Sequence, residues 1–400
     1  MSDSCIAAVT LGPGETEVRE FPLPRIGEED GLLKIEACGV CGSDWPFYAG
    51  IQQGVGAQGP PQPRIQGHHN IGRIAKVGKE AAQRWGVTEG DRVAVEEFIP
   101  CGHCSMCLTG NYRLCDASDL MLGAPGTYLR YGAVPTSVSP SLWGGYSEYQ
   151  YLHPNSILYK IADHVPAEMG PLFIPIANGI RWMCEVGGAG IGSTVVIQGP
   201  GQHGLGCVVA AKEAGASCII VTGLTKDARR FEVARSLGAD YTIDVQREDV
   251  IERVCEITGG ALADVVVDVS AGTTEPLTLA LELARKLGIV ILAGQKHSPV
   301  PSFDSMSIYR RELTVRGVRG HDLRSVVPAI KVIESGKYPL ERMLTHLYSL
   351  DEVGQALSTI GGQGDSDSIH LSVMPVLKRS PNGQPDVDGD RRTRIKKRHE

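Results

Sequence analysis

Two kinds of hydrophobic pattern divide the chain. Up to about residue 160, apolar residues occur in short alternating runs, such as 31–37 and 92–96, between many glycines and prolines. Alternation with a period of two is typical of half-buried strands, so this part is predicted to be an irregular, mainly β domain. From residue 193 the apolar runs become continuous and alternate with longer helical stretches.

The second pattern predicts an open sheet. Its short apolar runs predict strands over residues 194–198, 217–222, 241–244, 263–269 and 288–292. Helices are predicted between them, near residues 205–214, 227–237, 248–258 and 275–286. Strands that alternate with helices imply a parallel sheet covered on both faces, because each parallel crossover needs a connecting segment. We therefore predict an α/β fold whose doubly wound domain spans residues 163–302.

The alternation stops beyond residue 301. A helix is predicted near residues 323–335, but the segment 303–377 shows no sheet of its own. We expect this segment to complete the first domain, which comprises residues 1–162. The last stretch, residues 378–400, consists largely of Pro, Gly, Asp, Arg and Lys, which predicts a disordered tail.

Length and charge narrow the classes of partner. The 400 residues exceed what one hydrophobic core usually organises, in agreement with two domains. The formal net charge is −7, of which the tail contributes +4, so the preceding residues carry −11 and favour no nucleic-acid partner. The basic run 391–398 could contact nucleic acid or a membrane surface, but we expect a solvated tail. Neither a membrane-spanning run nor a signal peptide is evident, so we expect a cytoplasmic protein without a membrane partner.

A glycine motif follows the first strand of the doubly wound domain. Gly199, Gly201 and Gly204 form G-x-G-x-x-G between the strand and a helix. The first glycine permits a tight turn, the second lets a pyrophosphate approach the backbone, and the third lets helix and strand pack closely. In this strand–turn–helix context, the motif predicts a dinucleotide site that includes the adjoining Leu205.

The end of the second strand bears on the choice of cofactor. An acidic residue there would bind the ribose hydroxyls of NAD, but Gly223 occupies the expected position. Thr225 and Lys226 follow, with further cations at Arg229 and Arg230. A missing carboxylate and nearby cations accommodate a 2′-phosphate, so we favour NADP over NAD. The same cations equally fit the solvated face of a helix.

Four clustered cysteines predict a structural zinc site. Cys101, Cys104, Cys107 and Cys115 are spaced C-x-x-C-x-x-C-x7-C within a predicted lobe at residues 97–116. Four thiolates can close a tetrahedral shell around zinc without an open position, so such a site performs no chemistry. An iron–sulfur cluster is possible at this spacing but has no supporting context.

The chain resembles the medium-chain, zinc-dependent alcohol and polyol dehydrogenases over about residues 5–375. Besides the four-cysteine lobe, the resemblance rests on CGVCGSD at 38–44, GHHNIGRI at 67–74, GDRVAV at 90–95, GGYSEY at 144–149 and GPGQHGLG at 199–206. It implies a GroES-like, mainly β catalytic domain that is interrupted by the Rossmann domain, with the active site between the two. We expect a homodimer or homotetramer.

The resemblance also implies roles for individual residues. Cys41 and His68 are the expected ligands of a catalytic zinc, with water or substrate completing an open shell. Ser43 corresponds to the hydroxyl that takes the substrate proton, and Asp44 to the carboxylate that orients the ligand histidine. Asn178 is expected near the nicotinamide, although a polar residue in this apolar run equally fits a capping role.

Three positions depart from the family pattern. The family usually has Glu where His69 stands, and an acid or cysteine that holds zinc or its water where Ile174 stands. Pro46 replaces the relay histidine that is expected shortly after Asp44. Either Cys41, His68 and His69 hold the zinc together with water, or the catalytic zinc is weak or absent and hydride transfer depends on positioning and hydrogen bonds. We favour retained zinc.

These features predict an oxidoreductase. It would transfer a hydride between an alcohol, or its ketone or aldehyde, and NADP or NAD, with a small-molecule substrate and zinc assistance. One alternative on the same fold is a zinc-independent reductase of enones or quinones, which Ile174 and Pro46 favour and the four-cysteine lobe disfavours. An alternative of another class is a cofactor-binding protein without turnover.

Overall fold

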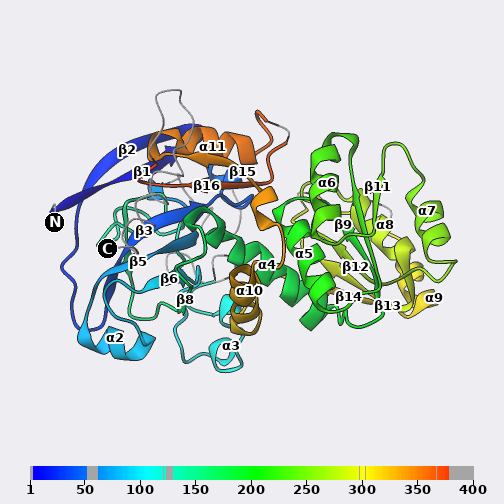
Figure 1. The fold of residues 1–400 in the computed structure, drawn as a ribbon, viewed down its shortest axis with the longest axis horizontal. Coiled ribbons are helices and arrows are strands. Elements are labelled where there is room, and N and C mark those ends of the chain that lie inside the picture. Colours follow the sequence, from blue (N-terminus) through cyan, green and yellow to red (C-terminus); the bar gives the residue numbers. More distant parts are fainter. Residues whose placement is uncertain are drawn as a thin grey trace, which may run out of the picture.

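The computed structural model describes residues 3–51, 62–119, 121–122, 129–296, 298–301, 303–365 and 367–377. Two β-rich bodies lie side by side along the long axis of the molecule, with helices α4 (Phe173–Gly179) and α10 (Leu323–Ser335) between them (Figure 1). The tail predicted at residues 378–400 lies outside the described residues. No helix among the described residues is long and apolar enough to cross a membrane.

One body is built from two mainly antiparallel sheets. A three-stranded sheet has the order β2-β1-β4, and a seven-stranded sheet has the order β15-β16-β3-β5-β6-β8, with β7 paired to β3. Its strands are β1 (Ser4–Gly12), β2 (Glu15–Pro22), β3 (Gly31–Gly39), β4 (Arg64–Ile65), β5 (His69–Val77), β6 (Arg92–Val95), β7 (Tyr149–Leu152), β8 (Leu158–Lys160), β15 (Leu344–Tyr348) and β16 (His370–Val373). Its helices are α1 (Trp45–Tyr48), α2 (Lys79–Trp85), α3 (Ser105–Leu108) and α11 (Val353–Ile360). The C-terminal segment thus contributes two strands to a sheet that the N-terminal segment begins.

The other body is a parallel sheet of order β11-β10-β9-β12-β13-β14. Its strands are β9 (Thr194–Gln198), β10 (Cys218–Gly223), β11 (Tyr241–Asp244), β12 (Ala263–Asp268), β13 (Ala284–Leu292) and β14 (Thr314–Gly317). Helices α5 (Gln202–Glu213) and α6 (Ala228–Leu237) pack on one face, and α7 (Val250–Ile257), α8 (Glu275–Leu283) and α9 (Ser305–Arg311) on the other. The predicted doubly wound α/β fold is confirmed.

Two elements differ from their sequence-based prediction. The parallel sheet continues to β14, beyond the boundary predicted at residue 302, because this edge strand is short, largely exposed and without an apolar run. The helix predicted over 275–286 ends at Leu283, and Ala284 instead pairs with Ala263 in β13. Sheet pairing there overrides a local helical pattern.

Helices α4 and α5 cross at very short range. A Cβ at Gly179 of α4 would lie 2.3 Å from the carbonyl oxygen of Gly206, and one at Gly206 of α5 would lie 2.2 Å from that of Pro175. Both distances are far below contact distance, so glycine is required on both helices. This crossing fixes the first turn of α5, which follows the glycine motif, against α4.

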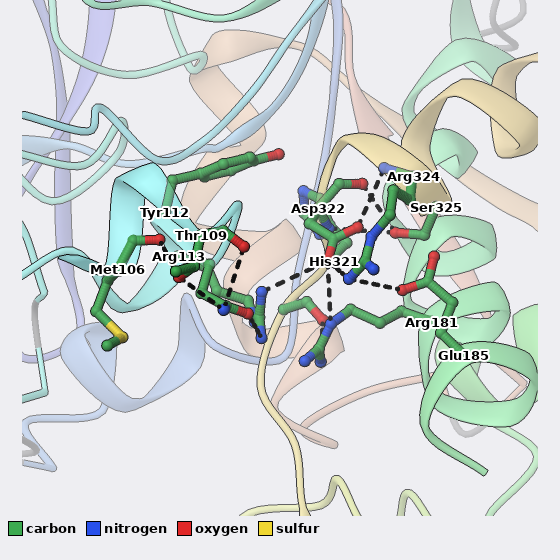
Figure 2. A network of polar contacts seen from close by, with 12 residues as sticks. Met106, Thr109, Tyr112, Arg113, Arg181, Glu185, His321, Asp322, Arg324 and Ser325 are labelled. Carbon is green, nitrogen blue, oxygen red and sulfur yellow. Dashed lines mark hydrogen bonds and ion pairs between the residues drawn. The ribbon is translucent and has the colours of Figure 1, made fainter. Parts of the chain in front are cut away.

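A buried polar network joins the four-cysteine lobe to α10 (Figure 2). The Asp322 carboxylate, at the N-cap of α10, lies 3.5 Å from Arg113 Nη1 of the lobe, 3.7 Å from Arg181 Nε and 3.1 Å from Arg324 Nη2. Arg113 and Arg181 are both buried, and burial together with the neighbouring Arg113 lowers the pKa of Arg181 to about 10. Asp322 therefore neutralises cations from two segments far apart in the sequence.

We predict that Asp322→Asn is strongly destabilising. Asparagine still caps the helix, but it leaves Arg113 and Arg181 buried without their counter-charge, which typically costs about 3–5 kcal/mol. Urea unfolding measures the change in the free energy of unfolding. Asp304→Asn at the exposed N-cap of α9 is the matched control and should have little effect. Equal losses in the two variants would contradict a stabilising role for the ion pairs.

Candidate functional site

Three buried donor atoms converge where β3 and β5 meet. Cys41 lies two residues after β3, His68 directly precedes β5, and His69 is its first residue. The antiparallel register places Gly39 opposite His69, and this brings the two ends together. The thiol and one nitrogen of each imidazole lie within 4.8 Å of one another, and all three residues are buried. This arrangement suits a metal ion.

Gly67 makes the turn that presents His68. Its φ is +89°, a left-handed conformation that other residues rarely adopt. A Cβ there would also lie 2.7 Å from Cys38 Sγ and from Tyr146 Cδ1. No larger side chain therefore fits beside His68 without displacing both neighbours.

Asp44 orients the first histidine. Its Oδ1 lies 3.2 Å from His68 Nδ1, while Oδ2 accepts hydrogen bonds from the Tyr146 hydroxyl at 2.9 Å and the Cys41 amide at 3.0 Å. A carboxylate on Nδ1 leaves His68 Nε2 to face the cluster, the arrangement found at many metal-bound histidines. Ser43 Oγ lies 3.3 Å from that Nε2. Ser43 and Asp44 thus contact opposite nitrogens of the His68 ring.

The buried donors fit a metal chemically as well as geometrically. His69 is 0% exposed, and apart from its contact with Cys41 neither of its ring nitrogens finds a hydrogen-bond partner among the described residues. A buried polar group without a partner is costly, and a metal bond would satisfy it. Although burial opposes ionisation, His69 and hydrogen bonds from His203 and His68 hold the pKa of Cys41 well below its usual value. The thiolate is the form that binds metals.

Ile174 offers nothing to this cluster. It is 1% exposed and packs in the core that α4 shares with α5 and the parallel sheet. Sequence reasoning missed an acid that the fold brings in instead. Glu97 Oε2 lies 3.7 Å from His68 Nε2 and accepts a hydrogen bond from Arg130 Nε at 2.6 Å. Burial opposes its ionisation, but the charges of Arg130 and His68 lower the pKa of Glu97 to about 2.

The four-cysteine lobe has the dimensions of a zinc shell. Cys104 Sγ lies 3.5 Å from Cys107 Sγ and 3.9 Å from Cys115 Sγ, and Cys101 Sγ lies 3.9 Å from Cys107 Sγ. Zinc–sulfur bonds of about 2.3 Å place tetrahedral sulfur atoms about 3.8 Å apart. Backbone amides of Cys101 and Cys104 point at Sγ atoms of the lobe, at 3.3 and 3.4 Å. Such N–H groups stabilise thiolates.

The glycine motif has the geometry that its spacing predicts. Gly199 has φ +103°, and a Cβ at Gly204 would lie 1.9 Å from the Gly199 carbonyl oxygen. A Cβ at Gly201 would meet open space, so the backbone there can be approached by a ligand. Leu205 is fully buried and its amide donates to the Gly201 carbonyl at 2.9 Å. It offers no free polar group to a dinucleotide.

Both an acidic side chain and basic side chains lie near the end of β10. Gly223 is its last residue and pairs with Asp244 of β11. Thr225 Oγ1 donates to the Asp244 carboxylate at 2.7 Å, so Thr225 is engaged with an acid. Lys226 and Arg229 are exposed. They are the cations that remain available to a ligand at this edge.

The described residues also reveal contacts that link the glycine motif to the donor cluster of Cys41, His68 and His69. Asn178 Nδ2 lies 3.2 Å from His203 Nδ1, and His203 Nε2 lies 3.8 Å from Cys41 Sγ. The adjacent Gln202 donates to the Val40 carbonyl at 3.1 Å. The only signal of this in the sequence is the polar pair between the motif's second and third glycines. That polar pair by itself does not indicate that its contacts lie near residue 41.

Two family models match the chain. The model described as the alcohol dehydrogenase GroES-like domain matches residues 27–163, and the one described as zinc-binding dehydrogenase matches residues 204–335. Together they cover most of the described part of the chain, and both contain residues discussed above.

Named relatives extend over nearly the whole chain. A probable alcohol dehydrogenase of Mycobacterium tuberculosis is 40% identical over 94% of this chain and 100% of its own length. An erythritol/L-threitol dehydrogenase of Mycolicibacterium smegmatis is 30% identical over 92% of this chain and 97% of its own. A putative zinc-binding dehydrogenase of Sinorhizobium meliloti, solved bound to NADP, superposes with a TM-score of 0.78 at 25% identity, over 93% of this chain and 99% of that one.

We predict that Cys104→Ser removes one tightly held zinc and lowers stability, because metal binding to a closed thiolate shell contributes to folding. Metal analysis after mild chelation and a thermal unfolding curve measure the two effects. Cys255→Ser, at an exposed cysteine outside both clusters, is the control and should change neither. Unchanged zinc content and thermal stability in Cys104→Ser would argue against a zinc site in the lobe.

Proposed function

The chain belongs to the zinc-dependent, medium-chain alcohol and polyol dehydrogenase family, and on that premise we propose that Cys41, His68 and His69 hold its catalytic zinc. The protein is an oxidoreductase that transfers a hydride between an alcohol, or the corresponding carbonyl compound, and a nicotinamide cofactor. Its substrate is a small molecule. A homodimer or homotetramer in the cytoplasm is the assembly and location that we propose for it.

One observation above all supports this ligand set. His69 is buried with no hydrogen-bond partner outside the cluster among the described residues, and its nitrogen lies within 4.8 Å of the donor atoms of Cys41 and His68. An imidazole thus takes the place of the carboxylate that the family usually has. Because imidazole is neutral, the site is more positive by about one unit of charge, which favours a negatively charged oxygen.

When bound, zinc supplies a Lewis acid that polarises the substrate oxygen. The residues of the chain then orient the site and carry the proton. Asp44 fixes the His68 ring, and Ser43, which lies 3.3 Å from His68 Nε2, accepts the proton of the substrate hydroxyl. Ser43 is exposed, so its own hydroxyl proton can leave to water as it takes up the proton of the substrate. A relay histidine in place of Pro46 is therefore unnecessary.

We further propose that NADP is preferred to NAD. Gly223 places no carboxylate at the end of β10, and the exposed Lys226 and Arg229 are available to a 2′-phosphate. The NADP-bound Sinorhizobium dehydrogenase is consistent with this preference. Asp244 beside Gly223 opposes it, but Thr225 and Gln246 donate hydrogen bonds to that carboxylate at 2.7 and 3.0 Å.

We predict that His69→Ala loses the catalytic zinc. Wild-type protein should hold about two zinc ions per chain and the variant about one, because removal of one of three protein ligands opens the site to chelators. Alcohol oxidation should be lost with the metal. His164→Ala, at an exposed histidine bonded to the Glu334 carbonyl, is the control. Full metal content and normal turnover in His69→Ala would rule out ligation by His69.

A second prediction concerns the cofactor. Replacing Lys226 and Arg229 together with alanine should weaken NADP(H) binding by at least about tenfold and leave NAD(H) unchanged, because a charge-assisted contact contributes about 1.5–3 kcal/mol. Calorimetry with both cofactors measures this, and Lys286→Ala at the opposite end of the sheet is the control. Gly223→Asp is a poorer test, because its Cβ would lie 2.9 Å from Pro200. Equal wild-type affinities for the two cofactors would contradict the preference.

A further inference from the structure

A continuous chain of polar contacts, which begins in the buried interior, ends at the proposed zinc ligand Cys41. Glu96 Oε1 lies 2.9 Å from His321 Nε2, and His321 Nδ1 lies 3.2 Å from Asn178 Oδ1. Asn178 Nδ2 in turn lies 3.2 Å from His203 Nδ1, and His203 Nε2 lies 3.8 Å from Cys41 Sγ. These five residues come from segments far apart in the sequence.

The inner part of this chain is buried in the fold. Glu96 and His321 are 0% exposed and Asn178 is 6% exposed, so water has little access to the contacts among these three, whereas His203 is only half-buried. Asn178 lies on α4 and His203 on the first turn of α5. The glycine crossing of these two helices sets the distance between the two side chains.

The chemistry of Glu96 sets the direction of the hydrogen bonds. Its carboxylate accepts from the Tyr112 hydroxyl at 2.9 Å and the Tyr159 hydroxyl at 3.2 Å, and it faces His321 Nε2 at 2.9 Å. Although burial opposes it, the charge of Glu96 raises the pKa of His321. Both ring nitrogens of His321 face an oxygen acceptor, Nε2 the Glu96 carboxylate and Nδ1 the Asn178 carbonyl, and only the protonated ring donates from both.

The next hydrogen bonds of the chain run in the same donor-to-acceptor direction. With its oxygen facing His321, the Asn178 amide donates from Nδ2 to His203 Nδ1. A His203 ring that accepts at Nδ1 carries its proton on Nε2, the nitrogen that faces Cys41 Sγ. The chain of contacts therefore presents an N–H donor to the thiolate.

We propose that His203 is a positioning residue that donates an N–H···S hydrogen bond to the Cys41 thiolate and thereby couples the dinucleotide loop to the catalytic metal. The inference rests on the proposed function, in which Cys41 binds that metal. A hydrogen bond to a ligand sulfur withdraws charge from it, so the metal retains more of its power to polarise a substrate oxygen. Because His203 lies within the glycine motif, a dinucleotide that moves this loop alters the bond. By linkage, metal binding then alters dinucleotide affinity by the same factor.

Cobalt(II) can replace the zinc proposed at Cys41, His68 and His69, and its spectrum then reports directly on the sulfur ligand. In His203→Leu we expect the thiolate-to-cobalt charge-transfer band to move to lower energy and cobalt affinity to fall about 10- to 100-fold. His203→Gln should restore both, because its amide nitrogen can occupy the place of Nε2. If the leucine variant does not fold, His203→Asn repeats the test, because its shorter amide does not reach Cys41.

Gln202→Ala is the matched control within the same loop. Gln202 contacts the Val40 carbonyl and His370 Nδ1, at 3.1 and 2.7 Å, and no contact of it with Cys41 occurs among the described residues. Its cobalt band should therefore match that of the wild type. Adding NADP⁺ should change cobalt affinity in the wild type and in His203→Gln, and by less in His203→Leu, where the contact of Gln202 with Val40 remains.

The outcomes separate the inference from its premise. A wild-type protein that takes up no cobalt outside the four-cysteine lobe would overturn the proposed zinc site and this inference with it. Normal cobalt uptake with the same band and affinity in wild type and His203→Leu would overturn the hydrogen bond alone. An equal effect of NADP⁺ on those two proteins would overturn the coupling.

Discussion

The register between β3 and β5 is the constraint on which the proposed site depends. It places Gly39 opposite His69 and so brings the end of one strand, with Cys41 beyond it, to the start of the other. Shifting a strand by one residue turns every side chain to the opposite face, and His69 would then leave the cluster. His68 escapes this alternation because it precedes the strand, after the left-handed turn at Gly67. Backbone pairing thus determines the donor set before any metal is bound.

The donor set differs from the family pattern in charge more than in shape. His69 replaces a carboxylate, and Ile174 replaces a second polar group with a packed hydrocarbon. A negative charge returns in Glu97, which lies against His68 but is itself neutralised by Arg130. The result is a cluster that is buried and poor in net negative charge. Such a site is suited to stabilise an anionic substrate oxygen, because the site has little negative charge to repel it.

Close contact between the two bodies makes the remainder of the site possible. The crossing of α4 and α5 requires Gly179 and Gly206, and it sets Asn178 beside His203. The ion pairs of Asp322 join the four-cysteine lobe to α10 (Figure 2). Glycines and buried charges, rather than apolar packing alone, therefore determine how the dinucleotide loop meets the donor cluster.

The sequence by itself determined the features that depend on local order. Hydrophobic period gave the bounds of β9, β11 and α10 as the structure has them, since buried strands and amphipathic helices have distinct periods. The spacing of the four cysteines and of the motif glycines was enough to identify both motifs. Only the tertiary structure decided which distant side chains meet. The pairing of Glu97 with Arg130, and of His203 with Cys41, follows from sheet register and helix crossing, which depend on contacts between segments that no local pattern records. Strand β14 was not predicted, because an edge strand with one neighbour in the sheet needs no apolar run in its sequence.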